Sequence, residues 1–548
     1  MLRVSTCISN RYPLTRGCTD PADFQHCFIP VQTEDDLTTR IVDQVAAARA
    51  SGINAVYAVN YDPARLGHSA ECNGPSTNVG FQCPNLEDGM ARAHLDAIAS
   101  DLPIFVTSEA GHVTFANTPA LVELNICGTD VSDPTNCITP ITNPSQEEAL
   151  AQVGQLDEDL SFVSTNHFES QILKADPIGV AADIARGVSL YVQHGYTLSQ
   201  EGAADTFEVS LYLGAIKADP NFPLTTAMLM YDPNSGDFSD TVAMANQAQQ
   251  LINGNPDIFV AALKSFADGS TEEYTGYLAE EYFSLFLPFT WSVFPQPYMG
   301  LPDLTENEMA ARAVVAHQTG YPLFIHQNGD QAISDSIGAL QEAQRLSPAP
   351  NFRDLVLHAP LIDASELALV KGLNDPVSFL MNDLYYWGLP LCQQIIGPTL
   401  ATRTHSLYPA ADAEDAGLRV TLHSDTPVSP PDPLFEIWVA KTRAVQQPPW
   451  YPNLNSRQCP PVMNPNESIS IERGLQAFTS NAAWQYGLEN QIGTIEPGFT
   501  ADLVLLSDDP LSMENSPNDL QSIRILATMH HGQYLANPTA NQTPIWPQ

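Results

Sequence analysis

The chain has 548 residues, and its 63 acidic side chains outnumber its 22 basic ones, so its formal net charge is −41. This charge argues against nucleic acids and anionic membranes as partners, because both are bound through basic surfaces. The hydrophobic share of 44% is ordinary for a globular protein with a buried core. No segment reaches the roughly 18 uninterrupted apolar residues of a membrane span. The length fits several domains, or one large barrel with a small companion.

Helical and strand-like patterns alternate along most of the chain. Apolar residues recur with helical spacing in residues 34–51, 85–100, 304–320 and 329–346. Short apolar runs typical of buried strands occupy residues 102–108, 188–195, 224–231, 257–269, 321–330, 354–360, 375–382 and 418–425. Strands that alternate with helices predict parallel βαβ units. Seven or eight units predict an α/β fold with a (β/α)8 TIM-like barrel. The glycine-rich motifs that would favour an open nucleotide-binding sheet do not occur in the sequence.

The pattern changes after about residue 468. A helical segment is followed by short β segments with Gly and Pro turns, which predicts a small, partial β-sandwich near the C-terminus. Two or three strands rarely form a stable sheet alone, so we expect another part of the protein to complete it. The predicted division is therefore a barrel with Cys- and Pro-rich insertions over residues 1–467, and a terminal helix with a partial sandwich over residues 468–548.

Four polar residues stand at or just after the ends of predicted strands: Lys264, His326, His358 and Asp425. Side chains at the C-terminal ends of barrel strands converge on one mouth. Two imidazoles, a carboxylate and an open position form the ligand set of a catalytic divalent metal ion, for which Zn²⁺ is the first choice and Mn²⁺, Fe²⁺ or Ni²⁺ are alternatives. A carbamylated Lys264 would bridge two such ions, whereas a surface or salt-bridged lysine is the alternative. A single histidine is more often a hydrogen-bonded core residue, but several strand-end candidates in order favour a metal site.

The cysteines and the N-terminus bear on the compartment. Seven of the nine cysteines lie within the first 137 residues, and the pairs Cys72/Cys83 and Cys127/Cys137 bracket short polar loops. This spacing favours loop-closing disulfides in an oxidising compartment over free thiols in a cytosolic enzyme. The N-terminal segment has no apolar signal-peptide core. We therefore expect a periplasmic or secreted protein if the natural N-terminus lies upstream of Met1, and a cytoplasmic one if the chain is complete as given.

From about residue 85 to residue 535 the sequence resembles amidohydrolase family 3, a group of the amidohydrolase superfamily that includes N-substituted formamide deformylases. Seven short motifs follow one another in the order that this family has. They are PIFVTSEAGHVTFANTPAL, ALKSFADGS, FIHQNGDQA, LVLHAPLID, SFLMNDLYYWG, GLRVTLHSDTPVSPPDPL and GTIEPGFTADLVLL. Each motif alone is weak, whereas seven in order are specific at the level of the family. The last motif resembles the one that closes the small sandwich beside the barrel.

The resemblance implies a role for each matching residue. His326 and His358 would lie on the metal side, and Lys264, if carbamylated, would bridge two ions. Asp425 would be a metal-side residue and the general base, with His326 the other catalytic residue. The substrate pocket would be lined by His112, Asn117, Tyr385, Tyr386 and Trp387. A loop-packing histidine and an aromatic core wall are the alternative interpretations for His112 and for the three aromatic residues.

The sequence departs from the family pattern in two places. The family has an HxH pair at the end of its first barrel strand, and no HxH occurs in the 548 residues. A first strand and the N-terminal half of the sandwich are not found either, so we expect a barrel that can be incomplete at its first strand. Either the given start is internal to a longer natural chain, which we favour, or the chain is a divergent member with an incomplete metal site. In addition, Asn382 stands where relatives often have a histidine, which puts the role of the YYWG segment in question.

We therefore expect a metal-dependent hydrolase that cleaves a carbon–nitrogen bond other than a peptide bond, an amide or formamide of a small molecule. Activated water would attack the carbonyl carbon, and Asp425 would pass a proton to the leaving nitrogen. A deaminase or a lactonase on the same scaffold is an alternative. A catalytically silent, metal-poor binding protein is another, and metal content would separate it from the enzyme. A homo-oligomer is compatible with the sequence.

Overall fold

The computed structural model describes residues 34–52, 54–62, 86, 91–126, 150–151, 153–175, 177–233, 236–283, 297–397, 406–447 and 459–536. Its largest sheet is parallel, and its seven strands lie side by side in chain order. They are β5 (Leu198–Ala204), β6 (Thr225–Met230), β7 (Ile258–Phe266), β8 (Leu323–Gln327), β9 (Leu355–His358), β10 (Val377–Phe379) and β11 (Val420–Leu422). The sheet curls into a half-barrel, which confirms the predicted α/β class. Within the described residues, no strand pairs with the outer edge of β5 or of β11.

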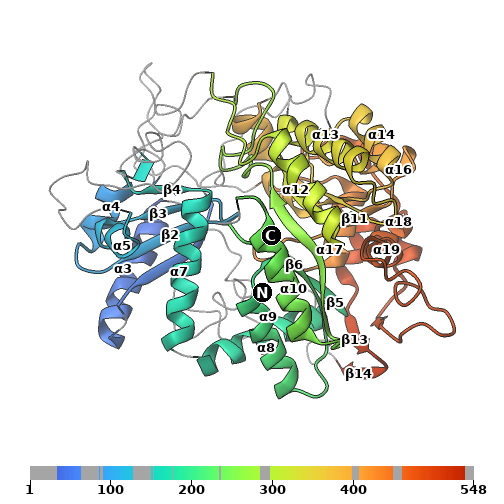
Figure 1. Ribbon diagram of the computed structural model, residues 1–548, viewed down its shortest axis with the longest axis horizontal. Helices are drawn as coiled ribbons and strands as arrows, with labels where there is room; N and C mark the ends of the chain where they lie inside the picture. The colour runs from blue at the N-terminus through green and yellow to red at the C-terminus, as the bar shows by residue number, and fades with distance from the viewer. Residues whose placement is uncertain are drawn as a thin grey trace.

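Helices that connect the strands, together with α17 after the last strand, cover the sheet (Figure 1). They are α9 (Thr206–Ala218), α10 (Ser239–Ile252), α12 (Glu306–Thr319), α13 (Asp330–Leu346), α14 (Ala364–Leu373), α15 (Met381–Pro390), α16 (Ala410–Asp415) and α17 (Pro433–Thr442). Capping boxes begin α9, α12 and α14, where the N-cap side chain and a glutamate three residues later each accept a backbone N–H. Helix α12 ends at Gly320 with a φ of 94°, a conformation that glycine adopts without steric cost. The helices predicted over 304–320 and 329–346 are confirmed.

A second sheet lies apart from the half-barrel, at the left of Figure 1. Its order is β1 (Val56–Tyr61), β2 (Ile104–Ser108), β3 (Val113–Ala116) and β4 (Gln155–Asp157), and only the β1–β2 pair is parallel. Helices α3 (Glu34–Ser51), α4 (Ala91–Ile98), α5 (Thr118–Glu123) and α7 (Asp159–Ala175) accompany it. The apolar run 102–108 is thus a strand, but the prediction that it belongs to the barrel is wrong. It pairs in parallel with β1 on one side and antiparallel with β3 on the other.

The predicted strand at 188–195 is also wrong, because it lies mostly within helix α8 (Pro177–Gln193). Val180, Ile184, Val188 and Tyr191 are buried at spacings of four, four and three residues, which is the stripe of a helix. The strand that follows, β5, has the sequence LSQEGAA and was not predicted. Because β5 contains polar residues, it does not form the apolar run from which strands were predicted.

The C-terminal part contains α18 (Ile471–Phe478), α19 (Ser480–Gln485) and a small antiparallel sheet. The order of this sheet is β12 (Leu503–Leu506), β13 (Ile525–His530) and β14 (Gln533–Ala536). Two hydrogen-bonded contacts attach β13 to the rest of the fold. Thr528 Oγ1 donates to the carbonyl of Val192 at 2.7 Å, and His530 Nε2 lies 3.0 Å from Thr225 Oγ1. The predicted small β element is therefore present as three strands that pack beside the half-barrel.

The structure describes one disulfide, between Cys392 and Cys459. The predicted pairs Cys72/Cys83 and Cys127/Cys137 lie outside the described residues. Among the helices that the structure describes, none combines the length and the apolar character needed to cross a membrane.

A buried ion pair joins the end of α12 to the start of β9. His317 Nε2 lies 2.8 Å from Asp354 Oδ2, and neither side chain is accessible to solvent. Asp354 also accepts the backbone N–H of Leu323, at the start of β8, at 2.7 Å. Burial opposes the charge on His317, but the hydrogen bond and the negative charge of Asp354 outweigh it, so the pKa of His317 is raised.

Replacing His317 with glutamine is expected to destabilise the protein by about 1–3 kcal/mol at mildly acidic pH. Because the folded-state pKa is raised, the stabilisation is complete below the unfolded-state pKa and is lost as pH rises through the folded-state pKa. Urea unfolding of both proteins at about pH 5.5 and about pH 9 measures this difference. His167→Gln, in the exposed pair with Glu123, is the control. An equal loss of stability at both pH values would contradict a charged pair.

Candidate active site

A cavity of about 620 Å³ is lined by side chains of both edge strands of the half-barrel, β5 and β11, and of β7 to β10 between them. Five of the residues predicted for the site line this cavity: His112, Lys264, His326, His358 and Asp425. They come from five segments of the chain that are far apart in sequence. The convergence of Lys264, His326, His358 and Asp425 follows from the parallel sheet, because its strands all end at the same edge. His112 reaches the cavity from the second sheet, between β2 and β3.

Three histidines form a row across β8, β9 and β11. The ring centroids of His326 and His358 are 4.6 Å apart, and those of His358 and His423 are 4.9 Å apart. Burial lowers the pKa of each ring, and the positive charge that its neighbours would carry lowers those of His326 and His358 further; the pKa of His423 falls to about 4. All three rings are therefore neutral at physiological pH, the form in which imidazole binds a metal ion.

Hydrogen bonds hold these rings in place. His326 Nε2 lies 3.0 Å from the carbonyl oxygen of Gly269 and 3.2 Å from Asn328 Nδ2. The amide of Asn328 already donates to the same carbonyl at 2.9 Å, and a carbonyl can only accept, so the tautomer with the proton on Nε2 and a lone pair on Nδ1 satisfies the contact with Gly269. His423 Nε2 lies 3.1 Å from His358 Nδ1, and His423 Nδ1 lies 2.8 Å from Ser378 Oγ. Such contacts orient the ring of a metal-binding histidine and select its protonated nitrogen.

The chain adopts unusual backbone angles where two of these strands end. His358, Ala359 and Asp425 have φ values of 68°, 43° and 50°, a left-handed region that residues other than glycine rarely adopt. His358 ends β9, and Asp425 follows β11 by three residues. The surrounding fold therefore holds these two side chains in the cavity wall at a local steric cost.

Lys264 lies in β7 and is only 3% exposed. Its Nζ lies 4.5 Å from the centre of the Phe266 ring. Burial lowers the pKa of Lys264 to about 7, and the negative charge of Asp425 offsets only part of this effect. Within the described residues no carboxylate lies within ion-pair distance of Nζ. The lysine is therefore not part of a surface or structural salt bridge in the described structure.

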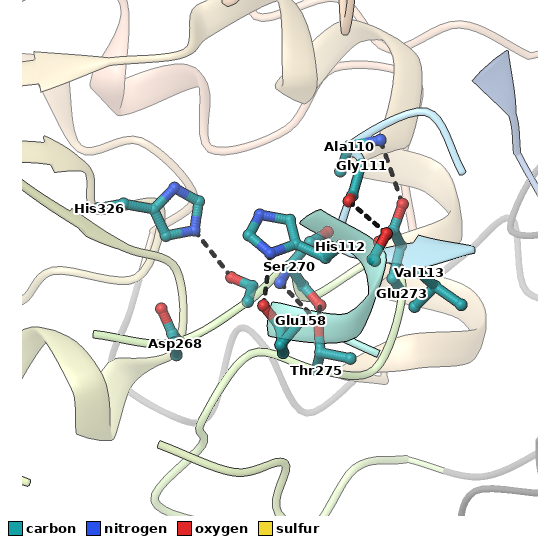
Figure 2. A network of polar contacts seen from close by, with 12 residues as sticks. Ala110, Gly111, His112, Val113, Glu158, Asp268, Ser270, Glu273, Thr275 and His326 are labelled. Atoms are coloured by element: carbon teal, nitrogen blue, oxygen red, sulfur yellow. Dashed lines mark hydrogen bonds and ion pairs between the residues drawn. The ribbon is translucent and has the colours of Figure 1, made fainter. Parts of the chain in front are cut away.

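His112 joins the second sheet to the row of histidines on the half-barrel. Its ring centroid lies 4.9 Å from that of His326, and its Nδ1 lies 2.7 Å from Glu158 Oε2 (Figure 2). The backbone N–H of Glu158 donates to the carbonyl of His112 at 2.7 Å, so the two residues are linked twice. Glu273, which burial gives a pKa of about 8, accepts the N–H of Ala110 in the same loop. These bonds fix His112 at the edge of the cavity.

The motifs ADG and NGD meet behind His326. Asp268 accepts the backbone N–H groups of Tyr277, Asn328 and Gly329 at 2.7–2.9 Å, which ties the loop after β7 to the loop after β8. A Cβ atom on Gly329 would lie 1.9 Å from the carbonyl oxygen of Tyr277, so only glycine fits there. These residues therefore support the strand end that carries His326.

Four predicted pocket residues do not line the cavity in the described structure. Asn117 is the N-cap of α5; its Oδ1 accepts N–H groups of Ile104 and Ala120, and its Nδ2 donates to the carbonyls of Ala99 and Leu102. All of its hydrogen-bonding capacity is thus used within the fold. The others are the aromatic residues of α15: Tyr385, Tyr386 and Trp387.

These aromatic residues pack in the core instead. The ring of Tyr385 lies 5.0 Å from that of Phe435, and Trp387 Nε1 donates to Asp62 Oδ2 at 3.1 Å. Asn382, in the same helix, donates from Nδ2 to Ser429 Oγ at 2.9 Å, close after the strand end that carries Asp425. The YYWG segment therefore packs in the core next to the site. In the described structure it fits the interpretation of an aromatic core wall, and not that of a pocket lining.

Sequence reasoning missed two residues of the site. His423 stands two positions before Asp425 in the motif LHSD, and its place directly after β11 was the available signal. Glu158 had no signal, because it follows the three-residue strand β4 and pairs with His112 only through the tertiary fold.

Solved structures similar to this one give the same class of fold. A metal-dependent hydrolase from Pyrococcus horikoshii OT3 superposes with a TM-score of 0.56 at 17% identity, over 90% of this chain and 85% of its own. A metal-dependent hydrolase from Pyrococcus furiosus gives a TM-score of 0.53 at 17% identity, over 86% and 81%. This chain therefore has the fold of those hydrolases.

The amidohydrolase family model matches residues 29–536, so the chain belongs to the amidohydrolase family, a family of hydrolases. An N-substituted formamide deformylase of Arthrobacter pascens is 24% identical over 241 residues, which are 43% of this chain and 40% of that protein. The YtcJ protein of Bacillus subtilis (strain 168) is 24% identical over 468 residues, 83% of this chain and 77% of its own length.

Proposed function

We propose that the chain is a metal-dependent hydrolase that cleaves a carbon–nitrogen bond of a small molecule, an amide or formamide rather than a peptide. The observation that carries this proposal is the convergence of His326, His358, Lys264 and Asp425 on one cavity. Membership of the amidohydrolase family and the likeness to a formamide deformylase support the choice of bond. A cavity of about 620 Å³ is in the range that holds small ligands.

The residue types that line the cavity suit a divalent metal ion. His326 has a lone pair on Nδ1, His358 and His423 are neutral, and Asp425 supplies a carboxylate to the same cavity. In our proposal His326, His358 and Asp425 hold the ion, which would be zinc, and a carbamylated Lys264 would bridge it to a second. Such an ion lowers the pKa of water and polarises a carbonyl group.

The protein residues then have separate tasks. The carboxylate of Asp425 accepts a proton from the attacking water and returns it to the leaving nitrogen, which a carbon–nitrogen bond needs in order to break. His423 keeps the ring of His358 in place from the side. His112, with Nδ1 occupied by Glu158, presents its other ring nitrogen for the substrate.

The test is a hydrolysis assay on protein whose metal content has been measured. N-substituted formamides, simple N-acyl amides, Xaa-Pro dipeptides, lactones and cyclic amidines would be compared at equal concentration. We expect one or two ions per chain and turnover of formamides or amides. Turnover of only dipeptides, lactones or amidines would contradict the proposed bond. Substoichiometric metal, with ligand binding unchanged in Asp425→Asn, would instead indicate the silent binding protein.

Replacing Glu158 with glutamine is expected to lower kcat/KM roughly tenfold to a hundredfold, because His112 loses the carboxylate that orients it. Glu123→Gln is a matched control, because Glu123 pairs with the exposed His167 at 2.9 Å in the same manner. Unchanged kinetics in Glu158→Gln would show that His112 has no part in the reaction.

A further inference from the structure

A second group of metal-binding residue types lies at the other end of the parallel sheet. Asp257 immediately precedes β7, whereas the catalytic residues stand at or beyond the C-terminal ends of the strands. His530 ends β13 of the small sheet, which lies below β5 and β6 in Figure 1, and His531 follows it. Ligand atoms of Asp257, His530 and His531 all lie within 4.8 Å of one another. The group therefore connects the half-barrel with the small sheet.

The backbone presents His531 in an unusual way. His530 pairs with Gln533 across the hairpin, which leaves His531 and Gly532 as a two-residue turn with φ values of 48° and 78°. Such turns favour Asn, Asp or Gly, because both positions need a positive φ. The ring of His531 stacks on that of His530, with centroids 4.0 Å apart. The hairpin thus sets two imidazoles side by side and facing the barrel.

The contact between His531 and Asp257 has the spacing of two ligands of one ion. His531 Nδ1 lies 3.4 Å from Asp257 Oδ1, which is longer than a good N–H···O hydrogen bond. Two ligand atoms at about 2.0–2.1 Å from a tetrahedral ion are separated by roughly 3.3–3.4 Å. An ion could therefore join these two atoms without a change in the backbone.

His530 can act as the third ligand. It is buried, and its Nε2 lies 3.0 Å from Thr225 Oγ1. This hydroxyl can accept the proton of Nε2, which leaves the lone pair on Nδ1 for an ion. A hydrogen bond from the second ring nitrogen is a common outer contact of a metal-binding histidine.

We propose that Asp257, His530 and His531 form a second divalent metal site, separate from the catalytic cavity, which fastens the small sheet to the N-terminal end of the half-barrel. Two imidazoles and one carboxylate suit Zn²⁺ or a similar transition metal ion better than Mg²⁺ or Ca²⁺. An ion that binds only the folded protein stabilises it. Zn²⁺ is therefore expected to raise the midpoint of thermal unfolding by about 2–4 °C through this site.

The decisive variant is His531→Asn, because asparagine suits the turn and removes the imidazole. Chelator-treated wild type and variant would be dialysed against Zn²⁺, and bound zinc and thermal unfolding would be measured. We expect the variant to bind one zinc ion fewer per chain and to show a zinc-dependent rise in midpoint that is smaller by about 2–4 °C, while its metal-free midpoint equals or exceeds that of wild type. The catalytic cavity is the same in both, so its zinc cancels in the comparison.

Two further proteins complete the test. Asp257→Asn should lose the same zinc ion, whereas His167→Asn, from an exposed histidine–carboxylate pair, should bind as much zinc as wild type. Mg²⁺ in place of Zn²⁺ should leave the midpoint of every protein unchanged. Equal zinc content and an equal zinc-dependent rise in wild type and His531→Asn would overturn the proposal.

Discussion

Asp425→Asn is expected to lower kcat by roughly 10²–10⁴-fold, the usual contribution of a general acid or base. Asparagine has nearly the same shape as aspartate but cannot accept the proton of the attacking water. The rate would be measured on whichever formamide or amide the wild-type protein hydrolyses. The effect should fall mainly on kcat, because the proton transfer occurs after the substrate is bound.

Metal content and stability make this result interpretable. If Asp425→Asn keeps the metal and its thermal midpoint but loses activity, the residue acts in proton transfer. If it loses the metal as well, the carboxylate is needed as a ligand. Asp508→Asn, which removes a carboxylate from the stretch after β12, should leave kcat and metal content unchanged. Full activity in Asp425→Asn would contradict the assignment of the site.

Lys264→Ala should lower activity at least about a hundredfold and reduce metal content, if a carbamate on this lysine bridges two ions. A buried ammonium with no carboxylate within ion-pair distance among the described residues is unfavourable, and a carbamate between cations would remove that cost. Alanine leaves space beside Phe266 that a small carboxylate could fill. Acetate or propionate, added with the metal, should therefore restore part of the activity.

Lys217→Ala, at the exposed end of α9, is the matched control and should respond to neither change. Bicarbonate offers an independent measurement, because metal-free wild type reloaded without it should recover activity more slowly. If Lys264→Ala binds metal normally and needs no added carboxylate, a carbamate bridge is ruled out, and the lysine acts as a cation or in packing.

Sequence periodicity predicted a (β/α)8 barrel and located most strands of the half-barrel that the structure shows, because these strands are buried on both faces and appear as apolar runs. The strand predictions failed where a barrel strand is not apolar, or where an apolar run is not a barrel strand. Strand β5 contains Ser199, Gln200 and Glu201 facing a polar cavity, so it does not appear as an apolar run. The segment 188–195 is apolar because it belongs to a buried helix stripe, and the run 102–108 belongs to another sheet, which periodicity alone cannot distinguish.

The site residues also fall into two groups: those that a strand end locates in the sequence and those that only tertiary packing brings to the site. His326, His358 and Asp425 could be located because a strand end determines which way a following side chain faces. The pairing of Glu158 with His112 could not, since it depends on how two sheets pack together. Asn117 has the sequence context of a pocket residue, but its amide makes four hydrogen bonds at a helix start. A sequence motif can indicate that a residue is important, but it does not show which groups the side chain contacts.

The left-handed backbone at His358, Ala359 and Asp425 sets activity against robustness. Each such residue costs on the order of 1–2 kcal/mol relative to a relaxed backbone, and glycine would avoid the cost at all three positions. Random mutation filtered only for thermal resistance should therefore drift towards glycine here and lose the side chains of His358 and Asp425, to which we assign roles in the reaction. Directed evolution of this enzyme for heat tolerance therefore needs an activity screen in every round. Without it, the most heat-stable variants are expected to be inactive.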